Sequence, residues 1–504
     1  MDLLLFDFSQ LLTWQNLLVV IIGILYGLFI GTLPGMGATI GIALLLPLTY
    51  ELSPLAAILM LVAVYQSAEY GCSISAVVMG VPGTPAAAAT MIDGNALAKK
   101  GYPGKALGYS LTGSVIGGII GVIILMTLAI PLSSIAIDFA DPEIFLIGIL
   151  ALVSVASLGT HDVPKSIISI LLGLLLGLVG LDVLTGTSRF TFGVLSLMDG
   201  INYIALVVGV FAITEVLLMM GDLNKKYVTD SKNLKTHITW KEFKGVSKSM
   251  TRGSFIGAFT GVLPGLGAGP AAWFAYMDAK RNSKKPENFG KGEPDGIASP
   301  EAANNSAVGG ALVPLLTLGI PGSPATAVIL GAFLIQGITP GPSVFKNDFG
   351  LIAGIFWGFL LATILMYYIG KYTTSLWARM LTFPNFALTP IILLVSLVGV
   401  YAARNNIMDV WVAVIAGIFA FFMKKLDYSL PAFILAFILG PIIEESLRRT
   451  LVLSDGSYTI FLDRGYCLII LALIAIVVFG SIFKKHKNKK AAPSDLDSTK
   501  NMSN

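Results

Sequence analysis

The sequence has little charge for its length. Charged residues make up 12% of the 504 residues, while hydrophobic residues make up 55%. Soluble domains carry about 25% charged residues, so this composition excludes a soluble fold. Hydrophobic runs of about 20 residues recur from end to end, as in helical membrane proteins. We therefore predict an all-α polytopic membrane protein with about ten to twelve spans plus hairpins.

Cysteine and histidine are also scarce. Cys72 and Cys467 both lie in hydrophobic surroundings, which predicts neither a disulfide framework nor a metal site. The three histidines have no partner at the spacing of metal ligands. The HExxH and GxSxG patterns of common hydrolases are missing. We therefore expect no enzyme activity and no cofactor.

Basic residues concentrate in loops and in the tail, so the net charge of +4 does not indicate a nucleic-acid partner. Cytoplasmic loops of membrane proteins are rich in Lys and Arg. Applied here, this rule places Lys99–Lys105, the Asp222–Lys248 loop and the tail from Lys484 in the cytoplasm. The N-terminus carries Asp2 and no basic stretch, so we expect no cleaved signal peptide. The expected location is a cell membrane of the bacterial inner-membrane type.

Two motifs occur twice in the same order. Counting the spans between the first and the second copy of this motif pair places the two copies in opposite orientations. This predicts two inverted-topology repeats with discontinuous or re-entrant helices. Whether each Leu-Pro-Gly element is a broken span or a hairpin stays open, although the basic loop at Lys280 favours a hairpin. The first motif is Gly31, Leu33, Pro34, Gly35, Gly37, Ala38, repeated as Gly261, Leu263, Pro264, Gly265, Gly267, Ala268; the second is Gly80, Pro82, Gly83, Thr84, Pro85, Ala86, repeated as Gly319, Pro321, Gly322, Ser323, Pro324, Ala325.

These motifs divide the chain. The predicted parts are a first repeat core (1–107), connecting spans (108–221), a cytoplasmic Lys-rich loop (222–250), a second repeat core (251–348), C-terminal spans (349–483) and a disordered cytoplasmic tail (484–504). Glycines spaced by four bring small residues to one helix face and predict close helix packing. They are Gly113, Gly117 and Gly121, and then Gly173 and Gly177.

The stretch Ser299–Pro342 is hydrophobic enough for membrane depth, yet rich in Gly and Pro. Broken helices expose backbone N–H and C=O groups. Lipid cannot form hydrogen bonds with these groups, so they must face protein or a water-filled cavity. An exposed helix N-terminus suits a carboxylate, and backbone carbonyls suit Na⁺. The predicted substrate and ion site therefore comprises Pro34, Gly35, Gly37, Ser73, Gly83, Thr84, Pro85, Gly265, Gly267, Asn304, Asn305, Ser306, Gly322, Ser323 and Pro324.

Each of these signals has a second interpretation. A single Pro-Gly pair is usually a helix kink. Asn304 and Asn305 can serve as interhelical hydrogen-bonding residues. Glu69 and Glu301 are either buried carboxylates that carry a coupling ion or residues at a membrane interface.

The segment PEAANNSAVGGALVPLLTLGIPGSPATAVILGAFLIQGITPGP, preceded by GVLPGLGAGPAAWFAY, closely resembles the large membrane subunit of the tripartite tricarboxylate transporters. The likeness covers Trp14 to Pro342 by motif, and the remainder by span pattern. The chain departs from the family pattern at Cys72, Gly80 and Thr84.

This resemblance implies secondary import of carboxylates such as citrate, coupled to Na⁺ or H⁺. It also implies a small four-span membrane subunit and an extracytoplasmic solute-binding protein as partners, and it leaves a homodimer open. One alternative is a stand-alone carrier without a binding protein. Another is an intramembrane enzyme, which would need a Ser/His, paired Asp or metal constellation at depth.

Overall fold

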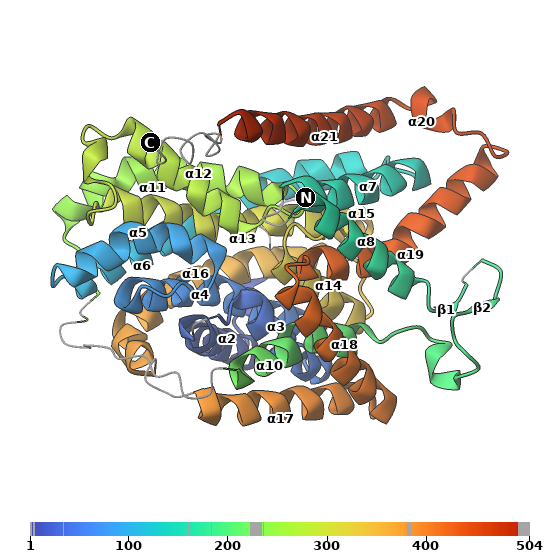
Figure 1. The fold of residues 1–504 in the computed structure, drawn as a ribbon, viewed down its shortest axis with the longest axis horizontal. Coiled ribbons are helices and arrows are strands. Elements are labelled where there is room, and N and C mark those ends of the chain that lie inside the picture. The colour runs from blue at the N-terminus through green and yellow to red at the C-terminus, as the bar shows by residue number, and fades with distance from the viewer. Residues whose placement is uncertain are drawn as a thin grey trace, which may run out of the picture.

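The structure is a computed structural model that describes residues 3, 6–33, 35–158, 162–182, 184–221, 234, 236–380 and 385–491. Helices form nearly all of it, with one short β-hairpin at the edge (Figure 1). Within the described residues, eight helices are long and hydrophobic enough to cross a membrane, and four hydrophobic helices are shorter. This confirms the all-α polytopic membrane class.

The helices run in two successive sets. The first is α1 (Phe8–Leu11), α2 (Trp14–Thr32), α3 (Ala38–Leu45), α4 (Pro54–Met79), α5 (Pro85–Lys99), α6 (Pro103–Ala136), α7 (Asp141–Leu158), α8 (Val163–Gly177), the antiparallel strands β1 (Gly180–Leu181) and β2 (Ser188–Arg189), α9 (Tyr203–Val208), a π-helical turn (Gly209–Ile213) and α10 (Thr214–Met220). The second is α11 (Trp240–Val262), α12 (Ala268–Asn282), α13 (Asp295–Leu318), α14 (Pro324–Ile335), α15 (Pro342–Asn347), α16 (Phe349–Met380), α17 (Asn385–Arg404), α18 (Ile407–Lys425), α19 (Leu430–Leu453), α20 (Ile460–Asp463) and α21 (Gly465–Ala491).

Both Leu-Pro-Gly elements are the tips of helical hairpins. Three glycines of α2 lie against backbone oxygens of successive turns of α4, so α2 and α4 run in the same direction. Since α3 links the end of α2 to the start of α4, it must return alongside them. The same pattern joins α11 to α13, with α12 as the returning helix. The contacts are Gly23 with Met60, Gly27 with Val64 and Gly31 with Ala68, then Gly253 with Ser299, Gly257 with Ala303 and Gly261 with Ala307.

The hydrophobic pattern predicts a helix over Pro54–Ser67, but α4 continues unbroken to Met79, so this predicted boundary is wrong. Two of its serine hydroxyls bond to carbonyls of the same helix. The Ser67 hydroxyl donates to the Ala63 carbonyl at 2.6 Å, and the Ser75 hydroxyl donates to the Cys72 carbonyl at 3.0 Å. Such bonds to the preceding turn let hydroxyl residues sit inside a buried helix.

α4 and α13 end in the same way. Gly80 and Gly319 take the left-handed conformation, with φ of 69° and 70°, which favours glycine as a helix C-cap. The next helices begin at Pro85 and Pro324, where proline loses no hydrogen bond. The second motif therefore forms a helix–loop–helix element in both halves of the chain.

Close packing also joins the two sets of helices. Gly113, Gly117 and Gly121 of α6 lie against the backbone oxygens of Ala298, Ala302 and Ser306 in α13. In α8, Gly173 and Gly177 lie against the backbone oxygens of Phe433 and Phe437 in α19. Both glycine series therefore mediate helix packing, as predicted.

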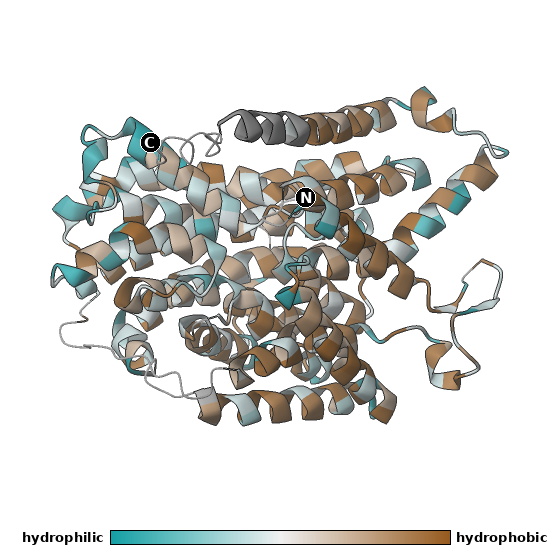
Figure 2. Cartoon of the chain, viewed as in Figure 1, coloured by the Kyte–Doolittle hydropathy of each residue, from teal (hydrophilic) through white to brown (hydrophobic). Residues whose placement is uncertain are grey.

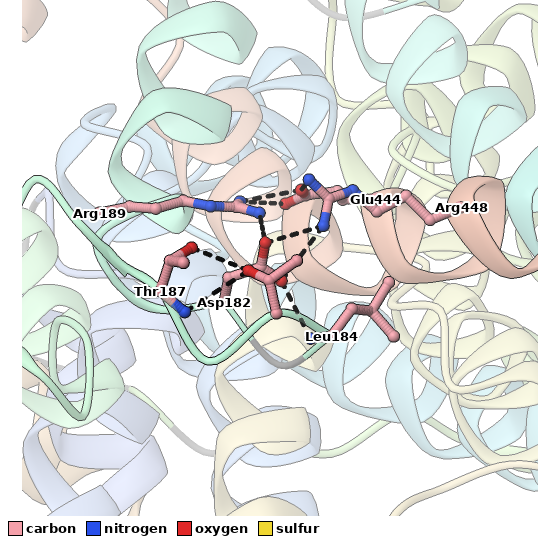
Figure 3. Close-up of polar contacts among 7 residues, drawn as sticks. Asp182, Leu184, Thr187, Arg189, Glu444 and Arg448 are labelled. Atoms are coloured by element: carbon pink, nitrogen blue, oxygen red, sulfur yellow. Dashed lines mark hydrogen bonds and ion pairs between the residues drawn. The ribbon is translucent and has the colours of Figure 1, made fainter.

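Hydrophilic residues gather at the two ends of the long axis, near the ends of α11 and α12 and along the last turns of α19 (Figure 2). At the α19 end, the β1–β2 hairpin is fixed by four charged residues (Figure 3). Arg448 binds Asp182 at 2.9 Å, and Arg189 binds Glu444 at 2.8 Å and also Asp182. The Arg448 guanidinium holds the pKa of Asp182 below its ordinary value.

Two boundaries differ from the sequence-based division. α11 begins at Trp240, within the segment 222–250 assigned to a loop, because Thr239 and Glu242 form a capping box. Lys105 also binds Glu242 at 2.7 Å and lowers the pKa of Glu242 to about 2. α21 extends to Ala491 and takes in the first part of the predicted tail, since Lys and Ala favour helix. Residues 222–233 and 492–504 lie outside the described residues.

We predict that Gly117→Ala destabilises the protein, whereas Gly245→Ala does not. A Cβ at Gly117 would lie 2.1 Å from the Ala302 oxygen, and such overpacking costs about 1–3 kcal/mol. A Cβ at Gly245 meets no atom within 4 Å, and alanine favours a helix over glycine by about 0.5–1 kcal/mol. Thermal unfolding of the purified variants measures the change in stability that each substitution causes. Equal melting temperatures for the two variants would contradict the packing role of Gly117.

Candidate substrate site

Four helix N-termini meet around one cavity of about 200 Å³. They belong to α3 and α12, the returning helices of the two hairpins, and to α5 and α14, which follow the two Pro-Gly loops. Two residues of α4, the start of α19 and one residue of α7 complete the wall. The lining residues are Thr39, Tyr65, Glu69, Thr84, Pro85, Ala86, Val155, Gly265, Leu266, Gly267, Ala268, Gly269, Pro270, Ser323, Pro324, Ala325, Ser429 and Pro431.

The four N-termini are capped in two different ways. The hydroxyl of Thr84 accepts the Ala87 N–H at 3.3 Å, and the hydroxyl of Ser323 accepts the Thr326 N–H at 3.2 Å. α3 and α12 begin after glycine instead, with no side chain to accept their first N–H groups. Open N–H groups and the positive ends of helix dipoles both favour an anion.

Glu69 is the only acidic residue that lines the cavity among the described residues, and no Lys, Arg or His lines it. Its side chain is buried, and Oε2 has no hydrogen-bond partner. One turn earlier on α4, the Tyr65 hydroxyl lies 2.9 Å from the Ser323 hydroxyl. This contact joins the first half of the chain to the Pro-Gly loop of the second half.

Several predicted site residues line this cavity. They come from both halves of the chain: Thr84, Pro85, Gly265, Gly267, Ser323 and Pro324. The remaining predicted residues that the structure describes lie outside the cavity wall. Pro34 lies outside the described residues.

The other tip glycines lie behind the wall, where the backbone is tightly packed. A Cβ on Gly83 would meet the Cys72 sulfur at 3.0 Å, and one on Gly322 would meet the Gly261 oxygen at 2.9 Å. The Gly322 carbonyl also accepts the Gly265 N–H at 3.0 Å, which ties the two tips of the second half together.

The two tip glycines of the first hairpin lie close to side chains of other elements. A Cβ on Gly35 would be 3.0 Å from a Glu215 carboxylate oxygen, and one on Gly37 would be 2.9 Å from the Thr84 methyl group. Glu215 itself pairs with Lys424 at 2.8 Å. Glycine here allows close approach between elements.

The polar residues of α13 divide into two kinds. Ser306 donates to the Ser254 carbonyl at 2.7 Å, which is an interhelical packing contact. Asn304 donates to the Glu69 carbonyl at 3.4 Å, and Asn305 to the Glu301 carbonyl at 3.3 Å. Both side-chain oxygens lack partners. Asn304 therefore links α13 to α4 beside Glu69, whereas Asn305 bonds within α13 beside Glu301, and both amides keep an acceptor free.

Ser73 belongs to a second polar cluster, away from the cavity wall. It binds Glu301, which also accepts hydroxyl groups of Thr90 and Ser114. We call Glu301 and these hydroxyl residues the Glu301 cluster. The sequence singled out Ser73 and Glu301 separately, without linking them.

The sequence-based site list omitted several lining residues. Tyr65 and Glu69 are four residues apart on α4, so helical spacing places them on one face, and this signal was available. Thr39 directly follows the first motif at the start of α3, whereas Val155 and Ser429 come from elements that carry no repeated motif. Only the three-dimensional arrangement brings them to the cavity.

Comparison with known proteins agrees with this architecture. The family model described as "Tripartite tricarboxylate transporter TctA family" matches residues 17–435. The chain belongs to this family. As a member of the TctA family, it is a multi-pass membrane component of the tripartite tricarboxylate transport system, which implies partner subunits. The resemblance stated from the sequence is thus confirmed.

Two similar proteins come from Agrobacterium vitis. The first is described as an uncharacterized 52.8 kDa protein in the TAR-I ttuC' 3'region; it is 38% identical over 474 residues, which are 94% of each chain. The second, an uncharacterized protein in the TAR-II ttuC' 3'region, is 36% identical over 234 residues, 46% of this chain and 97% of its own. No solved structure is matched.

We predict that a cysteine at Ala325 reacts with a small water-soluble thiol reagent, whereas one at Ala332 does not. Both alanines are buried in α14, but only Ala325 lines the cavity. The native Cys72 and Cys467 are buried, so background labelling should be low. Mass spectrometry after timed labelling measures the difference. Equal protection at both positions would mean that water does not reach the cavity.

Proposed function

We propose that this TctA family protein is the large membrane subunit of a binding-protein-dependent secondary transporter. It imports tricarboxylates or related carboxylates, with Na⁺ or H⁺ as the coupling ion, and binds them between two inverted repeats. The observation that carries this proposal is the meeting of four helix N-termini around one small cavity. Helix N-termini bind carboxylates without a basic side chain.

The size and chemistry of the cavity support a small anion. Its volume of about 200 Å³ is below the range of about 300–1,000 Å³ of pockets for drug-sized ligands. The uncapped N–H groups after Gly37 and Gly267 offer donors. Thr84 and Ser323 add hydroxyls, although these also cap their own helices.

The duplicated contacts support the inverted-repeat part of the proposal. In each half, three glycines of the first hairpin helix (α2 or α11) lie against the helix that follows the hairpin (α4 or α13). Each half also has a glycine in the left-handed conformation before its Pro-Gly loop. The Tyr65–Ser323 contact brings the halves together at the cavity. With the basic loops on one side, as the sequence predicts, the two copies enter the membrane from opposite faces.

Glu69 supplies a reason for ion coupling. A carboxylate substrate in the cavity would lie beside this buried side chain, and two negative charges at close range repel each other. Binding therefore requires that a proton or a nearby cation compensates the charge of Glu69. Such a requirement links substrate binding to ion binding.

The proposal includes the partners that the three-part system implies. A small four-span membrane subunit would complete the membrane complex, and an extracytoplasmic solute-binding protein would deliver the carboxylate. A homodimer of the large subunit stays a hypothesis. The expected location is an inner membrane with the C-terminus in the cytoplasm.

The proposal is tested by uptake of labelled citrate into vesicles that contain the reconstituted complex. We expect uptake in the presence of a Na⁺ or proton gradient and little without either. Each gradient is imposed separately, and vesicles without the binding protein serve as the control. Uptake that needs no gradient would exclude secondary coupling, and full uptake without the binding protein would favour a stand-alone carrier.

We also predict that Asn304→Ala abolishes uptake while the protein is still made. The change removes the donor to the Glu69 carbonyl beside the cavity and one free acceptor. Thr317→Ala is the matched control, because Thr317 is buried in the same helix and donates only to the Val313 carbonyl within it. Normal uptake by Asn304→Ala would reduce the amide to a packing role.

A further inference from the structure

Glu301 is fully buried in α13 and surrounded by hydroxyl groups. Its Oε1 accepts the Thr90 hydroxyl at 2.6 Å and also the Ser73 hydroxyl, while Oε2 accepts the Ser114 hydroxyl at 2.8 Å. The three hydroxyls come from α4, α5 and α6. Four helices from both halves of the chain therefore meet at one carboxylate.

The close packing of α6 on α13 brings this cluster together. A Cβ on Gly113 would lie 3.1 Å from the Cβ of Glu301, so glycine is needed for the approach. Ser110 and Ser114 lie one turn apart on the same face of α6. The hydroxyl of Ser110 is buried and has no hydrogen-bond partner, although it interacts with the Glu301 carboxylate.

No basic side chain pairs with Glu301 among the described residues. A buried carboxylate without a compensating positive charge is unfavourable in a membrane protein. One carboxylate carries one negative charge, which a monovalent cation neutralises. The described residues also contain no group of three or more His, Cys, Asp or Glu side chains that would suit a multivalent metal.

We propose that the Glu301 cluster binds one Na⁺ ion, at a site separate from the substrate cavity. Hydroxyl oxygens keep lone pairs for a cation when their hydrogens rotate away, and hard cations prefer oxygen ligands. The unpartnered Ser110 oxygen supplies a free ligand. The ligands are the carboxylate of Glu301 and the hydroxyls of Ser73, Thr90, Ser110 and Ser114, none of which lines the cavity.

This inference deepens the proposed function, since it gives the coupling ion a place. α4 carries both Ser73 and the cavity residue Glu69, one turn apart. Asn304 and Asn305 bind the backbones of Glu69 and Glu301 in turn. An ion that holds α4, α5, α6 and α13 together therefore also fixes one wall of the cavity.

The test measures Na⁺ binding by the purified full-length protein without any carboxylate. Thermal unfolding is followed while NaCl replaces choline chloride at constant ionic strength. Ligand binding to the folded state raises the melting temperature, so we expect a saturable rise for the unmodified protein and none for Glu301→Gln. Ser114→Ala should need about tenfold more Na⁺ for the same rise, as expected for a lost polar contact to a charged group.

Ser299→Ala is the matched control. This serine lies on the same helix and is equally buried, but its hydroxyl donates to the carbonyls of Ser249 and Ala275. It should keep the full response to Na⁺. If Glu301→Gln does not fold, the Ser114→Ala and Ser299→Ala pair still decides the question.

The proposal is overturned if Ser114→Ala and Glu301→Gln respond to Na⁺ like the unmodified protein. It is also overturned if acid, and not Na⁺, stabilises the unmodified protein, because the occupant would then be a proton. Normal Na⁺ binding without citrate uptake by the complex would refute the proposed substrate alone. Gradient-driven uptake without Na⁺ binding at Glu301 would refute the ion site alone.

Discussion

The architecture depends on one constraint: each backbone N–H and C=O group buried in the protein needs a hydrogen-bond partner or a ligand. Helices that end within a hydrophobic layer expose such groups, and lipid satisfies none of them. This chain ends several helices inside and places their tips against one another. The Gly265 N–H donates to the Gly322 carbonyl, and threonine and serine cap two of the new starts. The two glycine-capped starts keep N–H groups open toward the cavity.

Close helix packing makes this arrangement rigid. Glycines every four residues let α2 and α11 lie directly on the backbones of α4 and α13, and α6 approaches α13 in the same manner. A hairpin held along its whole length presents its tip at a fixed place. The small residues thus hold the four helix starts around one cavity, while the polar side chains of α4 and α13 lie between the two halves.

The sequence predicted the helical membrane class and named six residues that line the cavity, because repeated Gly and Pro patterns carry strong local constraints. It left open whether the Leu-Pro-Gly elements are hairpins or broken spans. Glycine patterns do not distinguish contact with a ligand from contact with neighbouring protein groups; Gly83 and Gly322 pack against Cys72 and Gly261 outside the cavity wall. The predicted helix that begins at Pro54 was also too short, because the sequence does not show that Ser67 and Ser75 bond to carbonyls of their own helix. Ser429 and Val155 were missed because tertiary packing alone brings their helices to the cavity.

The two buried glutamates break the duplication of the fold. In the alignment of the Pro-Gly loops, the positions that correspond to Glu69 and Glu301 are occupied by Val308 and Val62. Each glutamate therefore stands where the other half has valine, so the two halves cannot exchange roles: α4 supplies the carboxylate that lines the cavity, and α13 supplies the carboxylate of the Glu301 cluster.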